Sequence, residues 1–169
     1  MLTVIGDAND PDAWSGIPYH FLAAARAAGL IQRGLDLKPR GTAWRTRRLL
    51  WNLGRMLAAD RPGGYQFSAG FLERLWAPHL AAVEGCELVN HFQLYPPSVV
   101  SLAERGRVSL VPYIDMTLEE LFEGYRLKTK IGRRVALEAL ELESRGYRTA
   151  TKVITMSQQS ARILSTKYA

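Results

Sequence analysis

Cysteine is scarce in this sequence, and its scarcity excludes several classes of protein. A single cysteine, Cys86, stands among the 169 residues. One thiol cannot close an intramolecular disulfide, and no group of cysteines is available for a zinc site. We therefore expect a protein of a reducing compartment, the cytoplasm. We also expect no cofactor and no bound metal.

Long hydrophobic runs are also missing. The longest candidate, residues 21–31, is interrupted by Arg26, whereas a membrane-spanning helix needs about 20 consecutive apolar residues. The apolar run from Leu2 to Ile5 ends at once at Gly6, and no basic segment precedes it. Such a beginning is typical of a buried β-strand rather than of a signal peptide.

The composition that remains is that of one ordinary globular domain. The chain is 47% hydrophobic and 22% charged, and its length suits a single domain of about 100–200 residues. This apolar content argues against disorder, and the lack of a repeat period argues against collagen and coiled coil. We expect one domain over residues 1–169.

Short apolar segments alternate with helical segments along the chain. The pattern predicts strands at 2–5, within 30–37, and at 65–68, 86–92, 107–114 and 152–156. It predicts helices at 18–29, 43–59, 70–83 with an interruption at Pro78, 98–104, 117–145 with a break near Gly124 or Gly132, and from Ser157 onwards. Thr117 and Glu120 have the spacing of a capping box. Strands and helices that alternate without hairpin signals predict a Rossmann-like α/β fold, with a doubly wound, mostly parallel sheet and helices on both faces.

Positive charge is concentrated in one segment of the chain. The net charge is +6, and residues 31–60 contain seven basic against two acidic residues. A solvated helix face would tolerate this clustering. The alternative is a surface for polyanions, and tryptophans on a basic helix favour an anionic membrane over a nucleic acid. The candidate surface consists of Arg40, Trp44, Arg45, Arg47, Arg48 and Trp51. Zinc-finger spacing and RNA-stacking signatures are absent, so we expect no nucleic-acid partner.

Polar residues follow several of the predicted strands. In a parallel sheet the carboxyl ends of the strands share one edge, where ligands of doubly wound folds bind. The loop after the first strand reaches Ser15, Gly16 and Ile17 just before the predicted helix. The backbone N–H groups of this turn and the helix dipole can bind a phosphate, although a purely structural turn is an equal alternative. The paired-glycine fingerprint of dinucleotide-binding folds is absent, which argues against an NAD-dependent dehydrogenase.

His91 and Asp115 follow two later strands and are the candidate catalytic residues. His91 can bind a sugar hydroxyl or manage a proton at a reacting oxygen. The alternative is a histidine whose hydrogen bonds are satisfied within the fold. Asp115 can accept a hydrogen bond from a hydroxylated ligand, or it can pair with the N-terminus of the next helix.

The stretch DPDAWSGIPY, residues 10–19, resembles the opening of retaining glycosyltransferases of family 4, which have the GT-B fold. Three later stretches resemble that family in the expected order. Residues 113–117 resemble an aspartate–x–threonine element, residues 139–143 a Glu-rich helix, and residues 153–157 the closing strand and serine-capped helix of the N-terminal domain. Together the four stretches span most of the chain.

The resemblance implies a two-domain enzyme that transfers a sugar from a nucleotide-sugar to an acceptor with retention of configuration. This chain would be the N-terminal, acceptor-side domain, with the donor-binding C-terminal domain absent from it. By position, Gly16 and its neighbours Ser15 and Ile17 would approach the phosphates of the donor, and His91 would face the transferred sugar or the acceptor. The sequence around His91, NHFQ, departs from the paired histidines common in the family.

The resemblance also implies partners. We expect a nucleotide-sugar, an acceptor that is a glycan, a lipid or a small molecule, and the missing domain. From the basic segment we expect in addition a peripheral contact with the inner face of a membrane. The alternative is a non-catalytic Rossmann-like module that binds a protein partner or an anionic membrane through its basic helix.

Overall fold

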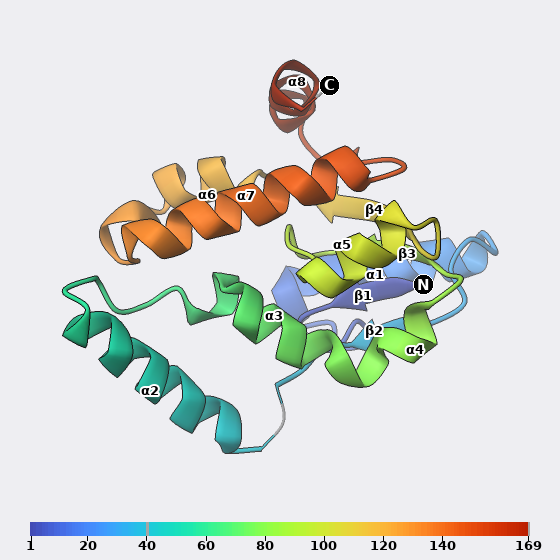
Figure 1. Ribbon diagram of the computed structural model, residues 1–169. Coiled ribbons are helices and arrows are strands. Elements are labelled where there is room, and N and C mark those ends of the chain that lie inside the picture. Colours follow the sequence, from blue (N-terminus) through green and yellow to red (C-terminus); the bar gives the residue numbers. More distant parts are fainter. Residues whose placement is uncertain (40, 169) are drawn as a thin grey trace.

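The computed structural model describes residues 1–39 and 41–168, and it has a parallel five-stranded sheet at its centre (Figure 1). The strands are β1 (Leu2–Val4), β2 (Gly34–Asp36), β3 (Glu87–Asn90), β4 (Ser109–Ile114) and β5 (Ile154–Thr155). Their order in the sheet is β2-β1-β3-β4-β5, and every neighbouring pair is parallel. This arrangement confirms the predicted Rossmann-like α/β fold.

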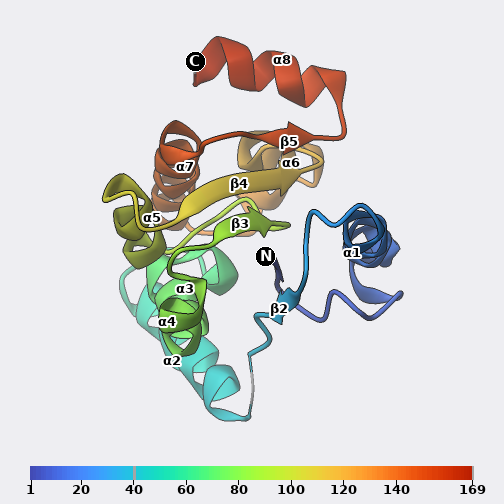
Figure 2. The ribbon, with the colours of Figure 1, turned by 90° about the vertical axis from the view of Figure 1, so that its right-hand side faces the viewer.

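Helices cover both faces of the sheet. Successive residues of a strand point to opposite faces, so the apolar strands present buried side chains on both sides. On one side, Val89 and Val111 pack with Leu22 of α1. On the other, Leu88 and Leu110 join the larger core, which is formed with α3, α5, α6 and α7. Figures 1 and 2 show α1 on the side of the sheet opposite to α3, α5 and α7. The α-helices are α1 (Ile17–Ala27), α2 (Ala43–Leu57), α3 (Ala69–Trp76), α4 (Leu80–Val83), α5 (Pro97–Glu104), α6 (Leu118–Gly124), α7 (Arg133–Thr149) and α8 (Gln158–Lys167).

Short 3₁₀ turns connect several of these elements. They are η1 (Ala13–Gly16), η2 (Tyr65–Phe67), η3 (Ala77–His79) and η4 (Leu127–Thr129). The interruption expected at Pro78 is η3, and the break expected between Gly124 and Gly132 contains η4.

Two helix caps are those that the sequence predicts. The Thr117 side chain accepts from the Glu120 N–H while the Glu120 side chain accepts from the Thr117 N–H, so the capping box of α6 is confirmed. Ser157 accepts from the backbone N–H groups of Gln159 and Ser160 and caps α8. These bonds satisfy donors that the first helical turn leaves unpaired.

Two strand predictions are wrong. Residues 65–68 form the turn η2 and the cap of α3, although their apolar–polar alternation imitates a strand. The reason is local: Gly64 adopts a left-handed φ of 80°, and the Ser68 side chain accepts the Phe71 N–H to begin α3. Residues 30–31 lie outside β2, because Leu30 and Ile31 donate their N–H groups to the Ala25 carbonyl at the end of α1.

The carboxyl ends of the strands lie at one edge of the sheet. Figure 2 shows the arrowheads of β3, β4 and β5 pointing to the same side. The chain leaves β1 toward β2 on one side, whereas β3, β4 and β5 follow on the other. The topological switch point, at which the strand order reverses, therefore lies between β1 and β3. In folds of this kind, the connections from these two strands run to opposite sides and leave a crevice between them.

Candidate functional site at the carboxyl edge of the sheet

A cleft of about 440 Å³ lies at this switch point. Its walls come from the loops that follow β1, β3 and β4, from η2, and from α6 with the residue that follows it. The residues that line it are Trp14, Ser15, Ile17, Gln66, Phe67, His91, Phe92, Gln93, Tyr113, Ile114, Asp115, Met116, Leu121 and Tyr125. Four of the five residues that the sequence places at this edge, Ser15, Ile17, His91 and Asp115, therefore border one cavity.

Gly16, the fifth residue, is buried and does not line the cleft. Three consecutive residues, Trp14, Ser15 and Gly16, have positive φ angles of 53°, 58° and 77°. A Cβ added at Gly16 would lie 3.0 Å from the Pro11 carbonyl oxygen. The fold therefore requires glycine at this position because of its φ and of the nearby Pro11.

The turn offers fewer free donors to an anion than the sequence suggests. The Ile17 N–H donates to the Trp14 carbonyl, and Pro18 has no N–H to offer. The turn thus holds its own shape by internal bonding, and phosphate binding by Ser15, Gly16 and Ile17 stays a prediction.

Gly16→Ala should destabilise the protein even when no ligand is bound. A left-handed conformation costs a non-glycine residue about 1–2 kcal/mol, and the contact with Pro11 adds to that cost. Gly29→Ala is the matched control, because Gly29 has a similar φ of 70° but no heavy atom within 4 Å of the added Cβ. Urea unfolding should show a larger loss for Gly16→Ala. An equal or smaller loss would contradict the steric role of Gly16.

His91 occupies the floor of the cleft. It is 7% exposed, and its ring lies 5.2 Å from that of Tyr113 and 5.8 Å from that of Trp14, measured between centroids. Its Nδ1 is buried without a hydrogen-bond partner among the described residues. Burial lowers the pKa of His91, against the opposing effects of the Tyr113 backbone and of the Asp115 charge. The imidazole is therefore neutral at pH 7 and can accept a proton or a hydrogen bond.

The loop that carries His91 is held by buried hydrogen bonds. The His91 N–H donates to the Thr3 carbonyl at 2.9 Å. The Thr3 hydroxyl donates to Asn90 Oδ1 at 2.8 Å, and Asn90 Nδ2 donates to the carbonyls of Phe92 and Leu94 at 2.6 and 3.1 Å. These bonds join β1 to β3 and to the loop after it, so the position of His91 follows from that of the sheet.

Asp115 stands at the rim of the cleft and is exposed. Its Oδ1 accepts the Met116 N–H at 2.9 Å, and its backbone carbonyl accepts the Ser160 hydroxyl at 3.1 Å. The helix that follows is capped by Thr117, so the alternative role of Asp115 as a helix cap does not apply. Its carboxylate is exposed, so that a ligand at the rim can reach it alongside the bond to Met116.

The aromatic lining of the cleft was missed by the sequence analysis. Trp14 is 46% exposed in the wall and donates its Nε1–H to the Ile5 carbonyl at 2.7 Å. Phe92 and Tyr113 complete the apolar surface beside His91. Trp14 lies within the WSG stretch and could have been selected there. Phe92 and Tyr113 belong to predicted strands, where apolar residues are expected, and so give no functional signal in the sequence.

The basic helix α2 contains five of the six residues of the candidate anionic surface. Trp44 and Trp51 are half-buried, and the Trp51 ring lies 5.6 Å from the ring of Tyr65. Arg45, Arg47 and Arg48 are exposed, and Arg40 lies outside the described residues. The large apolar side chains that α2 exposes are instead leucines and a methionine at positions 49, 50, 53, 56 and 57.

Membrane-spanning helices and metal-binding clusters are both absent from the described part of the chain. Within residues 1–39 and 41–168, no helix combines the length and the apolar character that a membrane crossing requires. Over the same residues, no group of three or more histidine, cysteine, aspartate or glutamate side chains is placed to hold a metal ion.

Comparisons with protein-family models, with curated proteins and with solved structures find no significant match to this chain. What the structure establishes is a Rossmann-like α/β fold with a parallel five-stranded sheet.

Proposed function

We propose that this chain is the acceptor-binding half of a retaining glycosyltransferase, which transfers a sugar from a nucleotide-sugar to a hydroxyl group of an acceptor. The donor-binding half would be supplied by a further domain. The observation that carries the proposal is that Ser15, Ile17, His91 and Asp115 line one cleft at the switch point of a parallel sheet. The resemblance of residues 10–19 and of three later stretches to family 4 glycosyltransferases supports it.

The chemistry of the cleft suits a polyhydroxylated ligand. Carbohydrates present apolar ring faces together with hydroxyl groups, and the cleft combines aromatic side chains with a neutral imidazole and a carboxylate. A few placed polar groups in a largely apolar lining are typical of small-molecule sites. We assign His91 to a hydrogen bond with a hydroxyl of the transferred sugar or of the acceptor, and Asp115 to a hydroxyl at the rim.

In the proposed reaction, the bond between the sugar C1 and a phosphate oxygen breaks, and a bond forms between C1 and the acceptor oxygen. The acceptor proton passes to a base or to the departing diphosphate. The transition state has oxocarbenium character, as in other glycosyl transfer, and the leaving charge needs fixed dipoles and cations. With one wall of such a site, this chain alone should show little or no transfer.

The proposal is tested in a longer chain that also carries a donor-binding domain. His91→Gln and Asp115→Asn should each lower the rate of sugar transfer by about tenfold, because each change disturbs a hydrogen bond to the ligand that contributes about 1–2 kcal/mol. The matched controls are His20→Gln and Asp12→Asn, because both residues are exposed and do not line the cleft. Cleft variants as active as these controls would overturn the proposal, as would transfer by the 169-residue chain at the rate of the longer one.

The second candidate function is a non-catalytic module that binds an anionic membrane or a protein partner through α2. The observation in its favour is the row of exposed apolar side chains on that helix. This candidate predicts that His91→Gln and Asp115→Asn leave every activity unchanged, whereas substitutions on α2 abolish binding. The cleft variants therefore separate the two candidates.

A further inference from the structure

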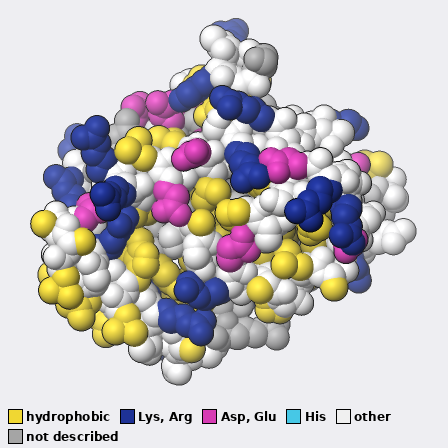
Figure 3. All heavy atoms as spheres, in the orientation of Figure 1, with side chains coloured by type: hydrophobic (Ala, Val, Ile, Leu, Met, Phe, Trp, Pro, Cys, Tyr) yellow, Lys and Arg dark blue, Asp and Glu magenta, His cyan; other side chains and the backbone are white. Residues whose placement is uncertain are grey.

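Helix α2 exposes an apolar stripe to solvent. Five of the large apolar side chains exposed by the described residues lie on it, and they are between 51% and 81% exposed. They are Leu49, Leu50, Leu53, Met56 and Leu57, which fall on one side of a helix with 3.6 residues per turn. We call this set the leucine face. Figure 3 shows hydrophobic side chains gathered where α2 lies, at the lower left of the view.

The opposite side of α2 attaches the helix to the rest of the protein. Trp51 packs near Tyr65, and Asn52 Oδ1 accepts the Gly63 N–H at 3.0 Å. The guanidinium of Arg55 lies 5.1 Å from the centre of the Trp51 ring, and it also faces the Asp60 carboxylate at 3.5 Å. Because these contacts use the tryptophan side of the helix, the leucine face points away from the protein.

The charge of α2 suits an anionic surface. The helix contains four arginines and no acidic residue. An amphipathic helix with an apolar face and a basic polar face is typical of helices that lie in the interface of a bilayer and are attracted by anionic lipids. Two copies joined through their leucine faces would instead offer no acidic partner to the arginines, because α2 contains no acidic residue. The charge therefore favours a membrane as the occupant of the leucine face.

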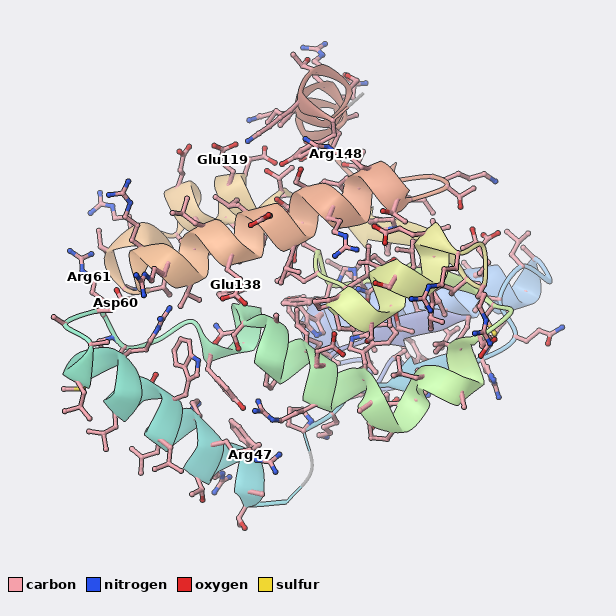
Figure 4. All side chains as sticks on the ribbon, viewed as in Figure 1. Arg47, Asp60, Arg61, Glu119, Glu138 and Arg148 are labelled. Atoms are coloured by element: carbon pink, nitrogen blue, oxygen red, sulfur yellow. The ribbon has the colours of Figure 1, made fainter. Side chains whose placement is uncertain are left out.

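A basic pocket of about 310 Å³ lies beside the first turns of α2, between Ala43, Trp44 and Arg47 of this helix, α3 and the segment after β2. Three cationic side chains line it, Lys38, Arg47 and Arg74, against one acidic residue, Asp36. Tyr65 and Phe71 are buried and form an aromatic floor, and the Arg74 guanidinium is oriented by a 2.7 Å bond to the Gly70 carbonyl. Figure 4 shows Arg47 on the side of α2 nearer α3.

The pocket and the leucine face lie on different sides of the same helix. An α-helix with its side chains is about 10–12 Å across, and an interfacial helix buries its apolar face about 5–10 Å into the boundary between headgroups and acyl chains. When the leucine face is in the bilayer, the pocket lies at the depth of the lipid phosphates. A phosphate attached to an apolar chain can then reach it directly from the membrane.

We propose that α2 is an interfacial membrane helix: its leucine face enters an anionic bilayer, and the pocket lined by Lys38, Arg47 and Arg74 binds the phosphate of a lipid headgroup. The proposal depends on α2 and its surroundings and does not depend on sugar transfer in the cleft.

Flotation with lipid vesicles tests the membrane contact. The protein should bind phosphatidylcholine vesicles that contain phosphatidylglycerol at least tenfold more tightly than pure phosphatidylcholine vesicles, and salt should weaken this binding. Leu50→Gln combined with Leu53→Gln should reduce binding at least tenfold, because the change removes apolar surface that would enter the bilayer. Glutamine is chosen because its helix propensity is close to that of leucine. The matched control is Leu137→Gln, because Leu137 lies on α7 and is 56% exposed. Equal binding to both vesicles, no binding, or equal loss in the control would overturn the proposal.

The pocket has its own test in the same assay. Arg47→Gln and Lys38→Gln should each weaken binding to the phosphatidylglycerol vesicles more than Arg105→Gln, which removes an exposed arginine outside the pocket. Equal losses would show only general attraction between charges and would overturn the headgroup site. Thermal stabilisation by inorganic phosphate that is lost in Arg47→Gln, without vesicle binding, would assign the pocket to free phosphate and also overturn it.

A second copy of the chain is the remaining occupant of the leucine face. Sedimentation without lipid should find no self-association that depends on Leu50 and Leu53. If the Leu50→Gln, Leu53→Gln variant instead converts a dimer to a monomer and binds vesicles as the unchanged protein does, the membrane proposal is wrong.

Discussion

Asn90→Ala should lower the free energy of unfolding by about 3 kcal/mol, because an unpaired buried polar group costs about 1–3 kcal/mol and this change leaves several. Asn90 is fully buried at 0% exposure. Its loss removes the donor to the carbonyls of Phe92 and Leu94, and it leaves the Thr3 hydroxyl with only the Val89 carbonyl, at 3.4 Å, in place of the closer Asn90 oxygen. Urea unfolding measures the loss, which is large because domains of this kind are stable by only about 5–15 kcal/mol.

The control for this change is Asn9→Ala. Asn9 is exposed, and its side chain bonds to Asp7 at the surface, so its replacement should cost less than about 0.5 kcal/mol, as is usual for surface positions. Asn90→Ala should also move the His91 loop, and the amide signals of residues 91–94 should shift. A loss near that of the control, with those signals unmoved, would show that the buried bonds of Asn90 do not position the cleft.

Glu143→Gln should remove a pH dependence from the stability of the protein. Glu143 is fully buried on α7, and its Oε1 accepts the Leu118 N–H at 2.6 Å and the Tyr147 hydroxyl at 2.9 Å. Its Oε2 is buried without a hydrogen-bond partner among the described residues. Burial raises the pKa of Glu143 from 4.5 to about 7, against the lowering effects of these two bonds and of the Lys167 charge, while the Glu119 charge adds to the rise.

The direction of the effect follows from the raised pKa. Below pH 4.5 the carboxyl is protonated in both the folded and the unfolded chain. Between pH 4.5 and about 7 the unfolded chain releases the proton that the folded chain retains, so stability falls as the pH rises. Above about pH 7 the full cost is reached, about 3 kcal/mol at 1.36 kcal/mol per pKa unit.

Glutamine resembles the protonated glutamate and keeps an oxygen for Leu118 and Tyr147. Relative to the unchanged protein, Glu143→Gln should therefore gain stability as the pH rises from 4.5 to 8, in urea titrations at each pH. Glu141→Gln is the matched control, because Glu141 is exposed on the same helix. A difference between the unchanged protein and Glu143→Gln that is constant with pH would contradict the raised pKa.

Much of the fold could be predicted from the sequence because local signals and the global fold agree. The short apolar runs at 2–5, 86–92 and 107–114 are strands because they are buried on both faces, as parallel strands are. The caps at Thr117 and Ser157 are set by residues within one turn of each helix. Such signals do not depend on distant parts of the chain.

The remaining features depend on contacts between distant residues. The side of α2 that faces the protein is decided by contacts with Tyr65 and Gly63. The sequence alone therefore could not show whether Trp44 and Trp51 face the protein or a membrane. The role of Gly16 is decided by the Pro11 carbonyl, which a reading of the turn alone does not place. The sequence places His91 and Asp115 at the carboxyl edge of a parallel sheet and so predicts where the cleft lies. The aromatic walls of the cleft are seen only in the structure.

The central claim is that the cleft at the carboxyl edge of the sheet is a binding site for a sugar-bearing ligand. The most direct test is to titrate the ¹⁵N-labelled chain with nucleotide-sugars and simple glycosides and to follow the backbone amide signals. The account predicts shifts at Ser15, Ile17, His91 and Asp115, which the His91→Gln change weakens. Shifts confined to other surfaces, or none with any of these ligands, would contradict it.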